Sequence, residues 1–347
     1  NKAQGEQNSF ILLCVLNIEK GMVISMDNLT GKDVAKVAGV STSTISRILN
    51  GSGGYSEATR DKVLNIINEL GYKQNAIARN LKTKKTHTIG VLMPRVVTTF
   101  YIKILDGIED VAQKFKYNVL FCHNILATED YLNIFIEQQV DGIIVCSISD
   151  EEKIDKIVME SGIPCVYIST LSSKYPIPYI KVDDFKALYE STSYLIKKGH
   201  RRIAMLAGND GPVSGIPRLN GFKQSMQDYG IPINKKLIKE TDFQYHLGVV
   251  AINELLDGDD DFTAIVACCD DVAVAAINEI YKRGKTVPKD FSIIGFDNTS
   301  VAEMSNPALT TVSQPLYKMG QEAVEVLLNN INNGTRINNL VMPFEII

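Results

Sequence analysis

The chain has 347 residues, 45% of them hydrophobic, and a formal net charge of −4, so it can bury a core large enough for two or three domains. No apolar run reaches the roughly 20 residues of a membrane-spanning helix, so no membrane partner is expected. The charge is unevenly distributed: residues 27–86 contain ten Lys and Arg against five Asp and Glu, and residues 87–347 contain 24 against 33. This segregation predicts that polyanion binding is confined to one end of the chain.

The first 26 residues differ from the rest of the chain. Phe10–Ile18 is apolar, but it lacks a cationic leader and a small-residue cleavage site, so it makes a poor signal peptide. We expect residues 1–26 to be a non-native or disordered extension, with the native protein beginning near Met26.

The cysteines predict a reducing compartment. There is no CxxC pair and no cluster of Cys and His, which are the usual signs of a structural metal site. We therefore expect buried free thiols, a cytoplasmic location, and no metal or cofactor. The six cysteines are Cys14, Cys122, Cys146, Cys165, Cys268 and Cys269.

Three short helices are predicted in the basic segment. Thr30 is a hydroxyl N-cap with Asp33 three residues later, a capping pattern that opens the first helix. A second helix follows the N-cap Ser41, and a third begins after Ser56 and ends at Gly71. Three such helices can close a small core of their own.

The second of these helices has two different faces. Ile45, Ile48 and Leu49 are spaced to form an apolar stripe, and the other face carries hydroxyls, an arginine and an amide. Together with the first helix it forms a helix-turn-helix that can enter the DNA major groove, although a generic surface hairpin fits this motif alone. Arg47 can bind a guanine edge bidentately or bind a phosphate. The other candidate DNA contacts on this helix are Ser41, Thr42, Ser43, Thr44, Ser46 and Asn50.

The segment Asn75–Leu81 would form barely two helical turns, which is too short to be stable alone in water. If it folds only when two copies meet on DNA, it couples the geometry of a dimer to DNA binding. A plain interdomain linker is the alternative.

These motifs together resemble the LacI/GalR family of bacterial transcription repressors. The resemblance implies a homodimer that binds a palindromic double-stranded DNA operator, with a hinge helix at Asn75–Leu81. Leu81 matches the leucine that wedges between base pairs in the minor groove, and Asn75, Ala78 and Arg79 are further candidate contacts. The matching motifs are Asp33-Val34-Ala35, Ala38-Gly39-Val40-Ser41, Thr44-Ile45-Ser46-Arg47, Gly71-Tyr72, Ala78-Arg79 and Ile89-Gly90-Val91.

From Thr88 onward, short apolar runs alternate with amphipathic helices, which is typical of βαβ units and parallel sheets. Two sheets accommodate seven such strands better than one sheet does, so we predict an α/β fold of two doubly wound parallel-sheet subdomains. The resemblance implies the same bilobed core, similar to periplasmic binding proteins. The predicted strands are 88–93, 118–122, 142–146, 165–169, 203–207, 263–267 and 292–296, and the predicted helices include 102–115, 185–198, 219–229, 272–283 and 319–330.

The predicted domains follow from these elements. A helix-turn-helix headpiece occupies residues 27–73, a hinge helix and linker occupy 74–86, and a ligand-binding core occupies 87–347. Within the core, the N-subdomain covers about 87–182 and 315–340, and the C-subdomain covers about 183–314 and a final strand at 341–347.

Candidate effector-binding residues lie just past the predicted strand ends, where open α/β sheets place their ligands. Phe100 and Tyr101 could stack on a sugar face or a flat ligand. The resemblance implies that Phe243 packs on the ligand and that Arg218 and Asp297 bind ligand hydroxyls. The full set is Arg95, Phe100, Tyr101, Ser169, Ser214, Arg218, Phe243, Asp270 and Asp297.

The predicted function is a sequence-specific repressor of a carbohydrate operon, whose operator binding is controlled by a small sugar or sugar phosphate. The direction of the Arg95 side chain distinguishes these two ligand classes. If its guanidinium points into the cleft, a sugar phosphate is favoured, and if it points outward, a neutral saccharide is favoured. A purine is less favoured, because purine-sensing relatives place an additional arginine where this chain has Pro212.

Three other functions remain as alternatives. An enzyme would need a catalytic constellation, and the sequence has no P-loop, no GxGxxG after a strand, no paired carboxylates and no HExxH. A sugar-binding receptor would leave residues 28–82 unexplained. A global catabolite regulator co-repressed by a phosphorylated carrier protein resembles the chain at Ile294–Asn298, but it carries a phosphate-binding arginine where this chain has Ser300.

Overall fold

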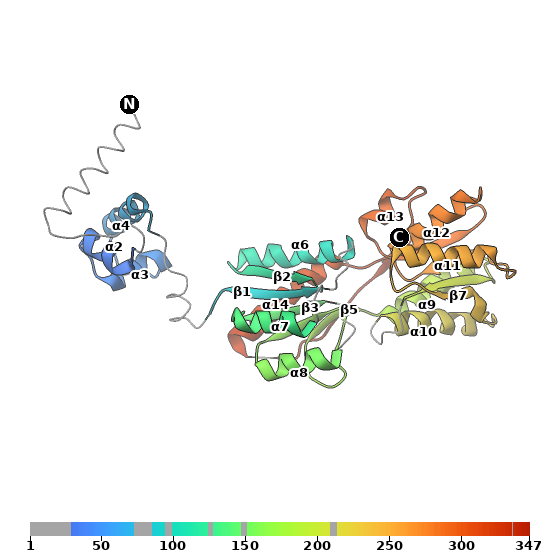
Figure 1. The fold of residues 1–347 in the computed structure, drawn as a ribbon, viewed down its shortest axis with the longest axis horizontal. Coiled ribbons are helices and arrows are strands. Elements are labelled where there is room, and N and C mark those ends of the chain that lie inside the picture. The colour runs from blue at the N-terminus through green and yellow to red at the C-terminus, as the bar shows by residue number, and fades with distance from the viewer. Residues whose placement is uncertain are drawn as a thin grey trace, which may run out of the picture. The chain divides into compact units, whose positions relative to one another are not determined.

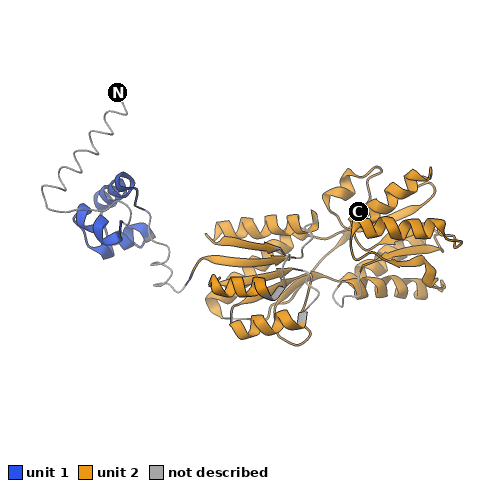
Figure 2. Cartoon of the chain, viewed as in Figure 1, with its two compact units in different colours: residues 1–85 blue, residues 86–347 orange. Residues whose placement is uncertain are grey.

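The computed structural model describes residues 29–72, 85–93, 99–123, 128–146, 151–208, 214–334 and 336–347. The chain forms two compact units, residues 1–85 and residues 86–347, which Figure 2 shows in different colours. Several predicted features lie outside the described residues. They are the extension at 1–26, the DNA contacts Asn75, Ala78, Arg79 and Leu81 of the hinge segment, and the effector candidate Arg95.

The first unit contains the three predicted helices, α2 (Gly31–Ala38), α3 (Thr42–Asn50) and α4 (Glu57–Leu70) (Figure 1). Each is followed by a glycine with a left-handed backbone, the conformation that a helix C-terminus favours and that only glycine adopts without cost. The helices close over one apolar cluster. Its buried members are Val34, Ala35, Ala38, Ile45, Ile48, Val63 and Ile67.

The second unit begins with a parallel sheet in the order β11-β5-β4-β3-β1-β2. Helices α6 and α14 pack together on one face, and α7 and α8 lie on the other (Figure 1). Because both faces are covered, β3 is buried along its whole length, which explains its unbroken apolar sequence. The elements are β1 (Thr88–Met93), α6 (Thr99–Lys114), β2 (Asn118–His123), α7 (Thr128–Glu137), β3 (Gly142–Cys146), α8 (Glu151–Ser161), β4 (Cys165–Ile168), β5 (Tyr179–Val182), α14 (Leu316–Asn333) and β11 (Leu340–Met342).

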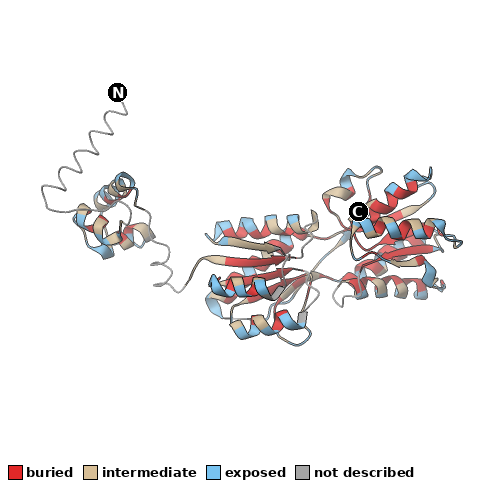
Figure 3. Cartoon of the chain, viewed as in Figure 1, coloured by how far each residue is buried: buried red, intermediate tan, exposed pale blue. Residues whose placement is uncertain are grey.

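The second sheet of this unit has the order β12-β10-β9-β8-β6-β7, and only the β12–β10 pair is antiparallel. Helices α9 and α10 contribute to the apolar cluster on one face, and α11 and α12 contribute to the cluster on the other. The central strands β6, β8 and β9 are buried between these helices (Figure 3), and the edge strands β7 and β12 are not. The elements are α9 (Asp184–Lys197), β6 (Ile203–Ala207), α10 (Gly215–Asp228), β7 (Ile238–Glu240), α11 (Tyr245–Asp257), β8 (Ala264–Ala267), α12 (Asp270–Lys282), β9 (Ser292–Asp297), α13 (Ser300–Met304), β10 (Thr310–Ser313) and β12 (Glu345–Ile346).

The two sheets and their helices form two lobes, which confirms the predicted α/β fold. The chain crosses between the lobes after β5, after β10 and after β11. The final strand was predicted wrongly as one element at 341–347. It is divided, because β11 pairs with β5 of the first lobe and β12 pairs with β10 of the second.

Candidate functional site

The start of α3 is fixed by Ser41. Its hydroxyl oxygen accepts a hydrogen bond from the backbone N–H of Thr44 at 3.1 Å, and it lies 2.6 Å from the hydroxyl of Ser43. Ser41 is therefore an N-cap. The capped end gathers hydroxyl groups at the positive end of the helix dipole, which is a favourable place for a phosphate oxygen.

The two faces of α3 differ as the sequence indicates. Ile45 and Ile48 are 2% and 5% exposed and anchor the helix in the core of the first unit. Arg47 is exposed, and its Nη1 lies 3.4 Å from the position that a Cβ on Gly54 would occupy. Asn50 is the last residue of the helix. The other predicted contacts are exposed (Ser41, Thr42 and Ser43) or partly exposed (Thr44 and Ser46).

A helix of this kind is suited to reading DNA. It is held by a small apolar core that it shares with α2 and α4, while its exposed face carries short hydroxyl side chains and one guanidinium. Short side chains let the helix approach base edges closely, and a guanidinium can donate two hydrogen bonds to one guanine. The first unit therefore has the surface expected of a helix-turn-helix headpiece.

The second unit has a buried charged cluster at the carboxyl ends of its second sheet, centred on Arg218 of α10. The Nε of Arg218 donates to Oδ1 of Asp184 at 2.8 Å, and its Nη1 donates to the carbonyl oxygen of Cys268. The same Nη1 lies 3.9 Å from Oδ1 of Asp297, the last residue of β9. Burial acts to lower the pKa of Arg218, but Asp184 and Asp297 outweigh it and hold that pKa above its ordinary value.

Asp297 is the second charged member of this cluster. It is 6% exposed, its Oδ1 accepts from Nε2 of Gln314 at 2.7 Å, and its φ of 113° is unusual for a residue with a side chain. Burial raises the pKa of Asp297 well above its ordinary value, against the opposing effect of Arg218. Such strained, desolvated carboxylates concentrate at functional sites.

Two aromatic rings enclose the Arg218 guanidinium. Its Cζ lies 3.6 Å from the ring centroid of Phe296 and 5.5 Å from that of Phe243. Phe243 also packs on the backbone at the end of β6, since a Cβ on Gly208 would lie 2.2 Å from the Phe243 ring. The cluster thus combines an aromatic ring with a paired cation and anion, which suits a ligand that has both an apolar face and hydroxyl groups.

Asp270 is held by hydrogen bonds within the second lobe. It is fully buried, and its carboxylate accepts hydrogen bonds from the backbone N–H and hydroxyl of Thr299 and from the hydroxyl of Thr311. Burial raises the pKa of Asp270 to about 6, although these bonds act to lower it. Asp270 therefore holds the segment after β9 in place beside Asp297, and its contact with an effector stays a prediction.

The first lobe brings two further candidates toward this segment. Phe100 and Tyr101 of α6 form an edge-to-face pair with ring centroids 4.9 Å apart. On the same helix, Nζ of Lys103 donates to the backbone oxygen of Asn298 at 2.7 Å, so the start of α6 lies beside the residue that follows Asp297. The aromatic pair and the charged cluster therefore belong to one region between the lobes.

The two serine candidates are less closely tied to the cluster. Ser169 follows β4 with a φ of 52°, and its backbone N–H donates to Ile180. Ser214 precedes α10, where its backbone oxygen accepts from the N–H of Arg218 at 3.0 Å. Both are partly exposed, and the loop that leads to Ser214 lies outside the described residues.

Asp184 and Lys103 were missed from the sequence, although both belong to this region. Asp184 is a buried acid at the first turn of a helix, directly after the first crossing between lobes. A charged residue at a predicted buried position is a signal that could have identified it. Nothing in the sequence near Lys103 separates it from an ordinary surface lysine.

Known proteins match both units of the chain. Residues 30–75 match the profile of bacterial regulatory proteins of the lacI family. Residues 86–347 match the profile of periplasmic binding proteins and the sugar binding domain of the LacI family. The chain belongs to the LacI family. It is a DNA-binding transcription regulator, and the headpiece match removes the alternative of a pure sugar-binding receptor.

Individual members of the LacI family agree with this assignment. Catabolite control protein A of Priestia megaterium is 36% identical over 312 residues, which cover 89% of this chain and 94% of that protein. The structure of the transcriptional regulator CelR in complex with cellobiose has a TM-score of 0.71 at 30% identity, covering 92% of this chain and 98% of that one. The lac repressor dimer bound to operator and an anti-inducer has a TM-score of 0.83 at 26% identity, covering 92% and 97%.

The described part of the chain lacks the features of two other kinds of site. There, no three His, Cys, Asp or Glu side chains gather in a way that could hold a metal ion. Within the same residues, no helix has both the length and the apolar character needed to cross a membrane. The five cysteines that the structure describes are free; four of them are buried, and Cys122, which was predicted to be buried, is partly exposed.

Proposed function

We propose that this regulator is a repressor of a carbohydrate utilisation operon, and that a small sugar or sugar phosphate bound between the lobes controls its affinity for an operator. The observation that supports this most strongly is the buried Arg218–Asp297 pair beside Phe243, at the carboxyl ends of the second sheet. That arrangement combines an aromatic face with charged groups that can each bind ring hydroxyls. The structure of CelR, a relative of similar fold, contains a complex of that regulator with cellobiose.

The lobes offer a route from ligand to DNA. A ligand that contacts Phe100 and Tyr101 on one lobe and Asp297 on the other changes the relative free energy of the lobe arrangements. The hydrogen bond from Lys103 to Asn298 spans the same region, so its length reports on that arrangement. In this proposal a homodimer binds the operator, as the lac repressor dimer binds its operator. The proposed operator is palindromic, which matches the two-fold symmetry of a dimer.

DNA binding can be tested by gel shift with fragments from upstream of the regulator's own operon. We expect a sequence-dependent shift that weakens as salt rises, because Lys and Arg contacts to phosphates release counterions. The absence of a sequence-dependent shift, both with and without candidate sugars, would contradict the proposal.

The ligand class can be tested by thermal shift with matched pairs, each sugar beside its phosphate. Stabilisation by the phosphate alone, lost in Arg95→Ala, would assign the phosphate to Arg95. Stabilisation by the neutral sugar, unchanged in Arg95→Ala, would assign a neutral saccharide. A phosphate effect that survives Arg95→Ala unchanged would exclude the role proposed for Arg95.

A global catabolite regulator is the second candidate, favoured by the 36% identity with catabolite control protein A. Against it, Ser300, the first residue of α13, stands where those regulators carry an arginine for the carrier's phosphate. A hydroxyl cannot form the bidentate contact of a guanidinium. We therefore propose an operon-specific repressor. Tight binding to a serine-phosphorylated carrier protein, measured by calorimetry, would favour the global catabolite regulator instead.

A further inference from the structure

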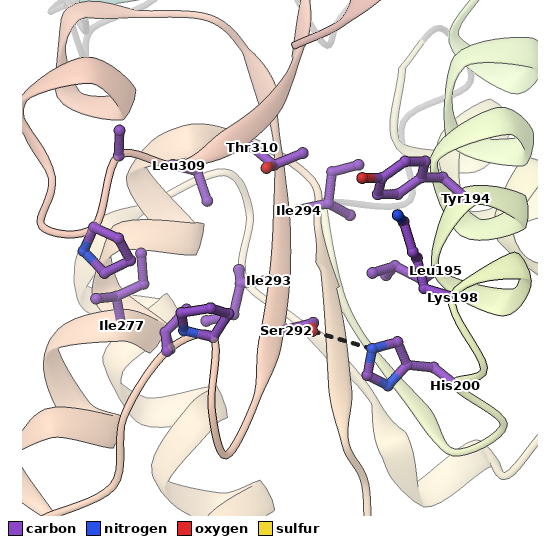
Figure 4. A pocket seen from close by; sticks show the side chains of 14 residues that line it. Tyr194, Leu195, Lys198, His200, Ile277, Ser292, Ile293, Ile294, Leu309 and Thr310 are labelled. Carbon is purple, nitrogen blue, oxygen red and sulfur yellow. Dashed lines mark hydrogen bonds between the residues drawn. The ribbon is translucent and has the colours of Figure 1, made fainter.

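A cavity of about 450 Å³ lies in the second lobe, away from the charged cluster at Arg218. Ser292 and Thr310, the first residues of β9 and β10, belong to its lining, so it opens at the amino-terminal edge of the sheet. Asp297 ends β9 at the opposite edge. Figure 4 shows Tyr194 and Lys198 on one side of the cavity and Leu309 and Ile277 on the other.

The stagger between two strands creates this space. Thr310 of β10 pairs with Ile294, so Ser292 and Ile293 of β9 extend beyond the start of β10. The chain that enters β10 lines the cavity with Pro307, Ala308 and Leu309 instead of continuing the sheet. The path of the backbone at the start of β10 therefore leaves room for the cavity.

The walls of the cavity have a defined chemical character. Apolar side chains, including Leu195, Ile277 and Ile294, form much of the lining, and none of the lining residues is Asp or Glu. Lys198 is exposed at one side, with its Nζ 5.4 Å from the ring centroid of Tyr194. The lining thus combines apolar side chains with the polar residues His200, Ser292 and Thr310, and it is positively charged at the side where Lys198 lies.

At neutral pH, Lys198 is the charged side chain of the cavity lining. The ring nitrogens of His200 lie 2.9 Å from the hydroxyl of Thr263 and 3.0 Å from that of Ser292, and burial lowers the pKa of His200, which favours the uncharged ring at neutral pH. The negative end of the α9 dipole lies nearby, but Nη1 of Arg201 donates to the carbonyl oxygens of Ile196 and His200 and offsets it.

We propose that this cavity is a second ligand site, separate from the sugar site, that binds a small amphipathic carboxylate. The apolar part of the ligand contacts the lining, and its carboxylate pairs with Lys198 and accepts from the Tyr194 hydroxyl. The volume lies within the range of roughly 300–1,000 Å³ that is typical of small-molecule pockets. A neutral analogue loses the charge interaction, and a cationic analogue is repelled by Lys198.

Calorimetry on the full chain tests this proposal with three probes of equal size: 2-naphthoate, 2-naphthamide and 2-naphthylmethylamine. We expect saturable binding of 2-naphthoate, weaker binding of the amide and the weakest binding of the amine. Lys198→Met should weaken 2-naphthoate binding by roughly two- to fivefold, the range for an exposed ion pair. Lys197→Met, an exposed neighbour outside the lining, is the matched control and should change nothing.

Ala308→Phe blocks the cavity from an exposed position. It should abolish 2-naphthoate binding while leaving the unfolding midpoint and the thermal shift by sugars unchanged. Equal binding of all three probes, binding of 2-naphthoate that persists in Ala308→Phe, or no saturable binding to the wild type would each overturn the proposal. If Ala308→Phe does not fold, the comparison of Lys198→Met with Lys197→Met decides: equal affinities would reject the site. None of these outcomes bears on the proposed sugar site, which the sugar thermal shifts report separately.

Discussion

Removing Asp184 should destabilise the second lobe by leaving a buried guanidinium without its main partner. The side chains of Arg218 and Asp184 are 6% and 3% exposed, and their ion pair is 2.8 Å long. Loss of one partner of a buried pair typically costs about 3–5 kcal/mol. Arg218 keeps its bond to the Cys268 carbonyl and a carboxylate 3.9 Å away on Asp297, so we expect Asp184→Ala to cost about 3 kcal/mol, the low end of that range.

The assay is urea unfolding of the full chain followed by circular dichroism. Asp184→Asn keeps an acceptor oxygen for Nε and loses only the charge, so it should cost less, about 1–2 kcal/mol. Glu190→Ala is the matched control on the same helix, because the Lys186–Glu190 pair is exposed and 3.8 Å long. That control should change stability by less than about 1 kcal/mol. A cost for Asp184→Ala no greater than that of Glu190→Ala would refute the importance of the buried pair.

Three further changes test other parts of the molecule. If Arg47 reads a base, as we propose, Arg47→Ala should weaken operator binding by about 1–3 kcal/mol and spare non-specific DNA; equal weakening of all DNA in a fluorescence anisotropy titration would make it a phosphate contact. Leu81→Ala should weaken operator binding but leave ligand affinity and the unfolding midpoint intact. A loss of ligand affinity, measured by calorimetry, would contradict the prediction that Leu81 acts only by inserting between base pairs. Asp270→Asn tests a pH effect: folding raises the pKa of Asp270 from 3.8 to about 6, so the folded state binds the proton more tightly. Its stabilising contribution is complete below about 4 and is lost as the pH rises through 6, so the difference in unfolding free energy between wild type and variant should change by on the order of 2–3 kcal/mol from pH 4 to 7. A difference that stays constant over that range would contradict the shifted pKa.

The strands whose bounds were predicted correctly are those with an apolar sequence that distinguishes them from their surroundings. Thr88–Met93, Gly142–Cys146 and Ile203–Ala207 have the predicted bounds, because burial on both faces leaves an unbroken apolar run. Strands that were not predicted are short and mixed in character, such as Tyr179–Val182 and Ile238–Glu240. Such strands are fixed by the neighbours they pair with, and local sequence does not report that pairing.

The same distinction applies to the site. Arg218, Phe243 and Asp297 were predicted from strand ends and from the family resemblance, and the structure brings them together. Asp184 was missed because its partner is 34 residues away in the chain. Asp270 was predicted to contact the ligand because it follows a strand. Its carboxylate also accepts hydrogen bonds from hydroxyls of two distant segments, at Thr299 and Thr311, which the sequence did not predict. Such contacts between distant residues cannot be predicted from the sequence around a strand end.

The measurement that tests the central claim most directly is the thermodynamic coupling between ligand and operator. Operator affinity is measured by fluorescence anisotropy at fixed salt, with and without the sugar selected by thermal shift. Ligand affinity is then measured by calorimetry, with and without operator duplex. If one protein binds both and links them, the two affinities must change by the same factor, typically 5- to 150-fold. We predict equal factors different from one. A sugar that binds the core tightly and leaves operator affinity unchanged would contradict a ligand-controlled repressor.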